Sequence, residues 1–180
     1  MKRVTKYYFI VLLLLIPFVA THGSAHRMRY TTGVQEVGIE GGIVSEGNFF
    51  GLCYRHYRAQ RLGLEAGMAL NLGKLGQYTA YKSFSLKLSA VYHVTPLLTD
   101  FVYFNVFSGL LFELRQQEVA KYKDKNETHL NWEGMLGAEL ECFVLERLIV
   151  SFRAAPSLYF LPKGYDKYRT RFSVGIKWIL

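Results

Sequence analysis

Two glutamates near residue 140 have the spacing of a carboxylate pair that could carry chemistry. Glu139 and Glu141 are two residues apart, so on an extended chain both side chains lie on one face. Neighbouring carboxylates are candidates for general acid–base catalysis. We favour a structural interpretation, in which they form ion pairs with Arg153, Arg169 or Arg171 on neighbouring strands. An enclosed charge must be paired, because burying an isolated one is very costly.

The histidines and cysteines show no spacing typical of a metal site. His56, His93 and His129 share no common interval, and Cys53 and Cys142 are far apart with no CxxC motif. We predict that both cysteines are unpaired, with their meeting across the fold as the alternative. No Ser/His/Asp arrangement stands out along the chain, although one assembled across strands stays open. We therefore expect no enzyme, no metal, no cofactor and no identified small-molecule substrate.

The elements that position these residues are strands, because apolar and polar residues alternate with period two. The alternation is clearest at 130–144 and 168–180, where no helix would separate the two sets of residues. Further strands are predicted near 35–44, 48–58, 61–73, 82–94, 101–114 and 148–160. Eight strands, an even number, predict an all-β fold: an eight-stranded antiparallel transmembrane β-barrel with up-and-down topology.

The N-terminal segment has the pattern of a cleavable secretory signal peptide. Lys2, Arg3 and Lys6 precede an apolar stretch, and small residues follow at Gly23 to Ala25. We expect cleavage after Ala25, so that 1–25 is the signal peptide and 26–180 is the barrel. The protein is then exported, and the expected location is the outer membrane.

The composition of the polar face indicates that it lies inside the barrel. It combines small residues with charges of both signs, which suits a narrow interior where ion pairs share little room. The predicted interior ion-pair network is Glu40, Glu65, Glu113, Glu133, Glu139, Glu141, Arg55, Lys87, Arg153, Arg169, Arg171 and Lys177. The alternative is a soluble lipid-carrying barrel with the two faces exchanged.

The apolar face is then expected to contact membrane lipid. The predicted lipid-facing residues are Leu130, Trp132, Leu136, Leu140, Phe172, Val174, Ile176 and Trp178. Aromatic side chains that could form interfacial girdles are Tyr30, Tyr54, Trp132, Tyr159, Tyr165, Tyr168 and Trp178.

The connections are expected to alternate between short turns and longer external loops, with both termini on the periplasmic side. The turns at 59–60, 95–100 and 145–147 are short, and the polar segment 116–128 is predicted as an external loop. The basic, aromatic stretch 55–61 could suggest nucleic-acid contact. We favour a strand end and turn that meet lipid headgroups or an acidic partner. An eight-stranded interior is filled by side chains and is no conduit for DNA, whose major groove alone is ~12 Å wide.

Residues 26–28 and the Gly-Gly strand 36–44, EVGIEGGIV, resemble the conjugal transfer protein TraO family of conjugative transposons. The likeness extends to the polar segment 115–128 and the alternating final strand, so it loosely covers the mature chain. It implies an outer-membrane component of a mating apparatus that contacts other transfer proteins. It implies no catalytic residues.

The leading functional prediction is accordingly a non-enzymatic anchor or docking barrel of a conjugative transfer apparatus. The alternative is a general small outer-membrane barrel for adhesion or envelope stability. Two further rivals are a barrel enzyme acting on lipids or peptides and a soluble periplasmic ligand-binding barrel.

Overall fold

The computed structural model describes residues 32–75, 79–96, 101–119, 126–160 and 168–180. The predicted signal peptide, 1–25, lies outside these residues. Among the described residues, no helix has the length and apolar character to cross a membrane. The secondary structure of the described residues consists of strands: β1 (Gln35–Val44), β2 (Gly47–Ala59), β3 (Leu62–Leu75), β4 (Thr79–Pro96), β5 (Val102–Val119), β6 (Asn126–Phe143), β7 (Leu148–Tyr159) and β8 (Tyr168–Ile179).

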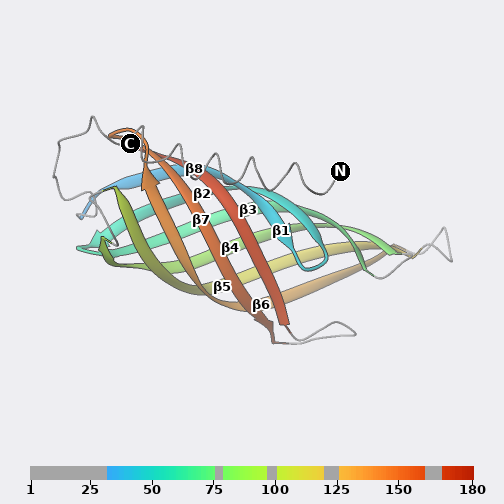
Figure 1. Ribbon diagram of the computed structural model, residues 1–180. Helices are drawn as coiled ribbons and strands as arrows, with labels where there is room; N and C mark the ends of the chain where they lie inside the picture. Colours follow the sequence, from blue (N-terminus) through green and yellow to red (C-terminus); the bar gives the residue numbers. More distant parts are fainter. Residues whose placement is uncertain (1–31, 76–78, 97–100, 120–125, 161–167) are drawn as a thin grey trace.

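Each strand pairs antiparallel with the next, and β1 pairs antiparallel with β8, which closes the barrel. This confirms the predicted eight-stranded up-and-down topology. Figure 1 shows the strands tilted around one axis, as closure of a barrel requires. We call the end that holds Gln35 and Ile179 the terminal end, and the opposite end, with the β1–β2 turn at Ser45 and Glu46, the loop end.

The loop end is uneven because the middle strands β4, β5 and β6 extend farther than the others, and these strands are longer than predicted. In Figure 1, β4, β5 and β6 extend to the right beyond the β1–β2 turn. Prediction placed an external loop at 116–128, whereas β5 continues to Val119 and β6 begins at Asn126, with Glu118 paired to Asn126. This part of the prediction was wrong. Cross-strand backbone hydrogen bonds sustain a strand beyond the apolar region, where hydropathy no longer marks it.

The alternation along each strand turns the apolar rows outward. Successive register partners form a continuous outer row that runs from β1 to β6: Ile39, Leu52, Met68, Leu86, Phe112 and Trp132. Large apolar side chains on the outer face are about half exposed to the surroundings. A contiguous apolar surface of this extent on a closed barrel is the arrangement expected where hydrocarbon surrounds the wall.

The inner face carries small apolar clusters between polar layers. Tyr57, Phe143 and Ile149 pack together near the terminal end. Val91, Phe107 and Ala155 form a second cluster, in the middle of the barrel. The remaining interior is mostly polar or charged, and it forms the candidate site.

Candidate functional site

All twelve residues predicted for the interior network lie on the inner face of the barrel. Eleven of them are buried, and Lys87 is partly buried. Their ion pairs fall into two groups. We call the group nearer the chain ends the terminal cluster: Glu36, Glu40, Arg55, Glu65, Lys87, Glu139, Glu141, Arg153 and Lys177. The other, the loop cluster, comprises Glu46, Glu113, Arg115, Glu133, Arg169 and Arg171.

Arg55 of β2 holds the terminal cluster together across the lumen. Its Nη2 lies 2.7 Å from Glu65 Oε2 and 2.6 Å from Glu139 Oε2. Its Nη1 lies 2.8 Å from Glu141 Oε1. Glu65 stands on the adjacent strand, but Glu139 and Glu141 stand on β6, on the far wall. One guanidinium therefore links three strands through charge-assisted hydrogen bonds.

Arg153 and Lys177 complete the environment of the same carboxylates. Arg153 donates from Nε to Glu139 Oε1 at 2.6 Å and from Nη1 to Glu65 Oε1 at 2.6 Å, and its Nη2 also pairs with Glu65. The Lys177 ammonium lies 2.5 Å from both Glu139 Oε1 and Glu141 Oε1. Glu139 thus meets three cations, and its charge is balanced within the barrel.

The loop cluster uses tyrosine hydroxyls as well as carboxylates. Arg169 Nη1 lies 3.1 Å from Glu113 Oε2 and 3.0 Å from Glu133 Oε1. It also donates to the hydroxyl of Tyr159 at 3.1 Å, and its Nη2 donates to that of Tyr81 at 3.1 Å. These bonds connect β4, β5, β6, β7 and β8 at one level of the barrel.

Apolar side chains fill the space between the two clusters. Phe49, Phe107, Leu111 and Met135 line a cavity of about 30 Å³, together with the stems of polar residues. The guanidinium of Arg153 lies over the Phe107 ring at 5.3 Å, and that of Arg171 lies over the Phe49 ring at 5.5 Å. A space of this size accommodates about one water molecule. Within the described residues, the middle of the lumen is filled.

The partners proposed for Glu139 and Glu141 were predicted only in part. Arg153 does pair with Glu139, its direct register partner on β7. Arg169 and Arg171 instead contact Glu113 and Glu133 in the loop cluster. The prediction failed for these two because it assumed neighbouring strands, whereas Arg55 and Lys177 reach Glu141 across or around the barrel.

Sequence reasoning missed three charged members of the clusters. Glu36 is four residues before Glu40 on β1 and therefore shares its inward-facing position in the alternation, but it stands next to the start of the strand. Arg115 follows the predicted end of its strand at 114, and it has the inward parity of Glu113. Glu46 lies in the β1–β2 turn, where parity gives no signal, yet its carboxylate lies 3.1 Å from Arg115 Nη2.

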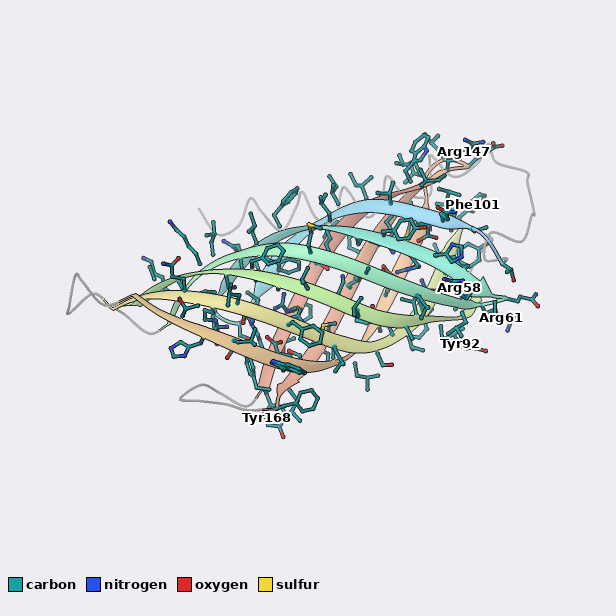
Figure 2. All side chains as sticks on the ribbon, turned by 180° about the vertical axis from the view of Figure 1, so that it is seen from behind. Arg58, Arg61, Tyr92, Phe101, Arg147 and Tyr168 are labelled. Atoms are coloured by element: carbon teal, nitrogen blue, oxygen red, sulfur yellow. The ribbon has the colours of Figure 1, made fainter. Side chains whose placement is uncertain are left out.

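The eight residues predicted to face lipid all lie on the outer face, with exposed fractions from 39% to 65%. Figure 2 shows side chains projecting outward along the barrel wall. Of the predicted girdle residues, Tyr54, Trp132, Tyr168 and Trp178 are exposed. Tyr30 and Tyr165 lie outside the described residues. Tyr159 was predicted wrongly, since it is buried and its hydroxyl accepts hydrogen bonds from Arg115 and Arg169.

The histidines and cysteines are not gathered into a site. Among the residues that the structure describes, no group of three His, Cys, Asp or Glu has a geometry suited to a metal ion. Cys53 is buried on β2 and Cys142 is half-buried on β6, and both are free, as predicted. His93 shares a hydrogen bond of 2.9 Å with Asn105 inside the barrel.

The basic stretch 55–61 divides between the two faces. Arg55 and Tyr57 are buried in the lumen, whereas Arg58 and Arg61 are exposed at the terminal end. Figure 2 shows Arg58 and Arg61 at that end, which also carries Arg147. Of the three arginines in this stretch, Arg58 and Arg61 are therefore accessible from outside the barrel and Arg55 is not.

Comparison with known proteins yields similarity of fold and no match by sequence. No protein-family model matches the chain, and no curated protein does. Neisserial surface protein A is similar in structure, with a TM-score of 0.62 and 13% identity, over 81% of this chain and 94% of that one. A major outer membrane protein from Thermus thermophilus gives a TM-score of 0.66 at 11% identity, over 82% and 99%. Ail, the attachment invasion locus protein of Yersinia pestis, gives 0.54 at 13% identity, over 83% and 100%. The chain thus has the fold of an eight-stranded outer-membrane β-barrel.

Proposed function

We propose that this protein is an outer-membrane anchor without enzymatic activity, which works through the ends of its barrel in adhesion or envelope stability. The filled lumen is the observation that carries this proposal. A cavity of about 30 Å³ between two ionic clusters provides no path for a solute. The outer wall is apolar and suits lipid. The two ends are then the surfaces left for contact with other molecules.

Different observations support the proposed membrane location and the proposed non-enzymatic role. The fold is shared with a major outer membrane protein. Residues 1–25 have the pattern of an export signal. The interior carboxylates, which are the candidates for acid–base chemistry, are bound by guanidinium and ammonium groups. An attachment role is favoured by the likeness to Ail, which is named for attachment and invasion.

A deletion strain tests the proposed role. Loss of the gene should lower binding of the cells to a host-cell layer or matrix, or should sensitise them to detergent. The intact gene supplied in trans should restore both properties. Unchanged adhesion and unchanged detergent resistance, with the protein shown to be present in wild-type outer membranes, would contradict this proposal.

A second proposal is that the barrel is a component of a conjugative transfer apparatus and contacts other transfer proteins. It is supported by the resemblance of residues 26–28 and 36–44 to the TraO family. Deletion of the gene in a donor cell should then lower the mating frequency, and complementation should restore it. An undiminished frequency would remove conjugation while leaving the barrel and its membrane location intact.

A further inference from the structure

A hollow of about 580 Å³ lies at the loop end, bounded by the ends of β2, β3, β4 and β5. Its walls include Asn48, Leu72, Lys74, Lys82 and Gln116, whose side chains are all exposed. Gly47, Gly73 and Ala80 also line it and leave space because their side chains are small or absent. Glu46 and Tyr81 complete the lining, and the Glu46 carboxylate is paired with Arg115 of the loop cluster, whose Nη2 lies 3.1 Å from Glu46 Oε2.

The hollow lies where the outer wall changes from apolar to polar. Phe50, Leu70, Phe84 and Leu114 are successive register partners, and all four are exposed. The next outward row toward the loop end contains Asn48, Leu72, Lys82 and Gln116. One step along the strands thus replaces three of the four large apolar side chains with two amides and an ammonium, and Leu72 remains as the apolar member of the row. Such a transition marks the level of the lipid headgroups in a membrane barrel.

Two lysines bring unpaired positive charge to this level. Lys74 on β3 pairs in register with Ala80, and Lys82 on β4 pairs with Leu72. The two lysines are therefore diagonal neighbours on one face, a relation that places Cα atoms roughly 7–8 Å apart. No carboxylate among the described residues forms an ion pair with either ammonium. Both ammonium groups are available to one ligand.

We propose that this hollow binds the phosphate-bearing headgroup of a membrane lipid. The ammonium groups of Lys74 and Lys82 contact the phosphate, Gln116 and Asn48 offer amides to the polar headgroup, and the acyl chains lie along Leu72 and Leu70. The inference rests on the proposed membrane location. A lipid fits better than a soluble phosphate compound because Leu72, which is 58% exposed, lines the hollow and continues into the apolar row.

The test uses the full chain purified in detergent and titrated with diphosphoryl lipid A, with bound lipid counted by native mass spectrometry. The double variant Lys74→Gln/Lys82→Gln should bind roughly 10- to 30-fold more weakly, because each basic residue near an anionic lipid surface contributes about fivefold. The control Arg147→Gln removes an exposed charge from the turn between β6 and β7, at the opposite end, and should retain nearly full affinity. Lipid A from which both phosphates have been removed should show no dependence on the lysines.

Three results would overturn the inference. These are equal affinity of the lysine variant and the unaltered protein, an equal loss in the arginine control, and displacement of the lipid by millimolar inorganic phosphate. The last result would assign the hollow to a soluble phosphate. Fractionation of cells that express the unaltered protein tests the location separately. A barrel in the membrane fraction whose lipid binding ignores the lysines refutes the site alone, whereas a barrel in the soluble fraction refutes the proposed location.

Discussion

At the scale of single residues, the interior shows how a protein can enclose many charges in a space closed to solvent. Each carboxylate of the terminal cluster lies close to a guanidinium or ammonium group. Removing charges from water is costly, and their mutual attraction offsets that cost only where geometry and hydrogen bonding are good. The network is therefore sensitive to the loss of any one member.

Glu139 provides the sharpest test at this scale. Glu139→Gln removes the negative charge that faces Arg55, Arg153 and Lys177 while it keeps the shape of the side chain. We expect the free energy of unfolding in lipid vesicles, measured by urea titration, to fall by about 3 kcal/mol, because buried cations are left without their partner. Glu146→Gln, in an exposed turn, should change it by less than about 0.5 kcal/mol. Equal stability of the two variants would contradict the assigned role of the network.

The members of this network were largely predictable from the sequence, but the ion pairs that they form were not. Parity along the strands identified twelve of its members, because inward and outward residues alternate. Parity does not specify which charge on the far wall each side chain meets, since that depends on strand tilt and register around the closed barrel. Arg55 forms ion pairs with Glu139 and Glu141 on the opposite wall, and no local spacing in the sequence indicates these pairs.

At the scale of elements, close approach of β1 and β8 closes the barrel and depends on a glycine. A Cβ at Gly42 would lie 2.0 Å from the Phe172 carbonyl oxygen and 2.7 Å from the Ser173 Cα. A Cβ at Gly41, one residue earlier, would have its nearest neighbour at 3.7 Å, an ordinary contact. A methyl group therefore fits at Gly41, whereas at Gly42 it fits only if the β8 backbone moves.

Gly42→Ala should destabilise the barrel by about 1–3 kcal/mol, because the β8 backbone must move to admit the methyl group. The matched variant Gly41→Ala should leave stability within about 0.5 kcal/mol. The loss of the compact, fast-migrating form on unheated gels, followed against urea concentration, measures both. If Gly41→Ala were the more damaging of the two, the described closure between β1 and β8 would be wrong.

Strand existence was predictable and strand length was not. The apolar rows mark where each strand crosses the apolar zone, so all eight strands were located. Beyond that zone the sequences of β5 and β6 are polar at successive positions, so the ladder that pairs Gln116–Glu118 with Asn126–Thr128 has no hydropathic signature. Hairpins that project past an apolar belt are therefore invisible to period-two analysis.

At the scale of the whole molecule, the filled lumen predicts a barrel that does not conduct ions. Two ionic clusters and the apolar layer between them leave a central cavity of about 30 Å³. The purified protein inserted into a planar lipid bilayer should show no stable single-channel steps in potassium chloride solution. Reproducible open channels would show that the interior rearranges, and the anchor proposal would lose its basis.

The central claim is that the apolar outer wall meets hydrocarbon, and the two tryptophans of the chain report on it directly. Trp132 on β6 and Trp178 on β8 both stand on the outer face, 48% and 45% exposed. In vesicles of lipids brominated along the acyl chains, their fluorescence should be strongly quenched, while aqueous acrylamide should quench it weakly. Efficient quenching by acrylamide with none by the brominated lipids would place the outer wall in water and contradict the account.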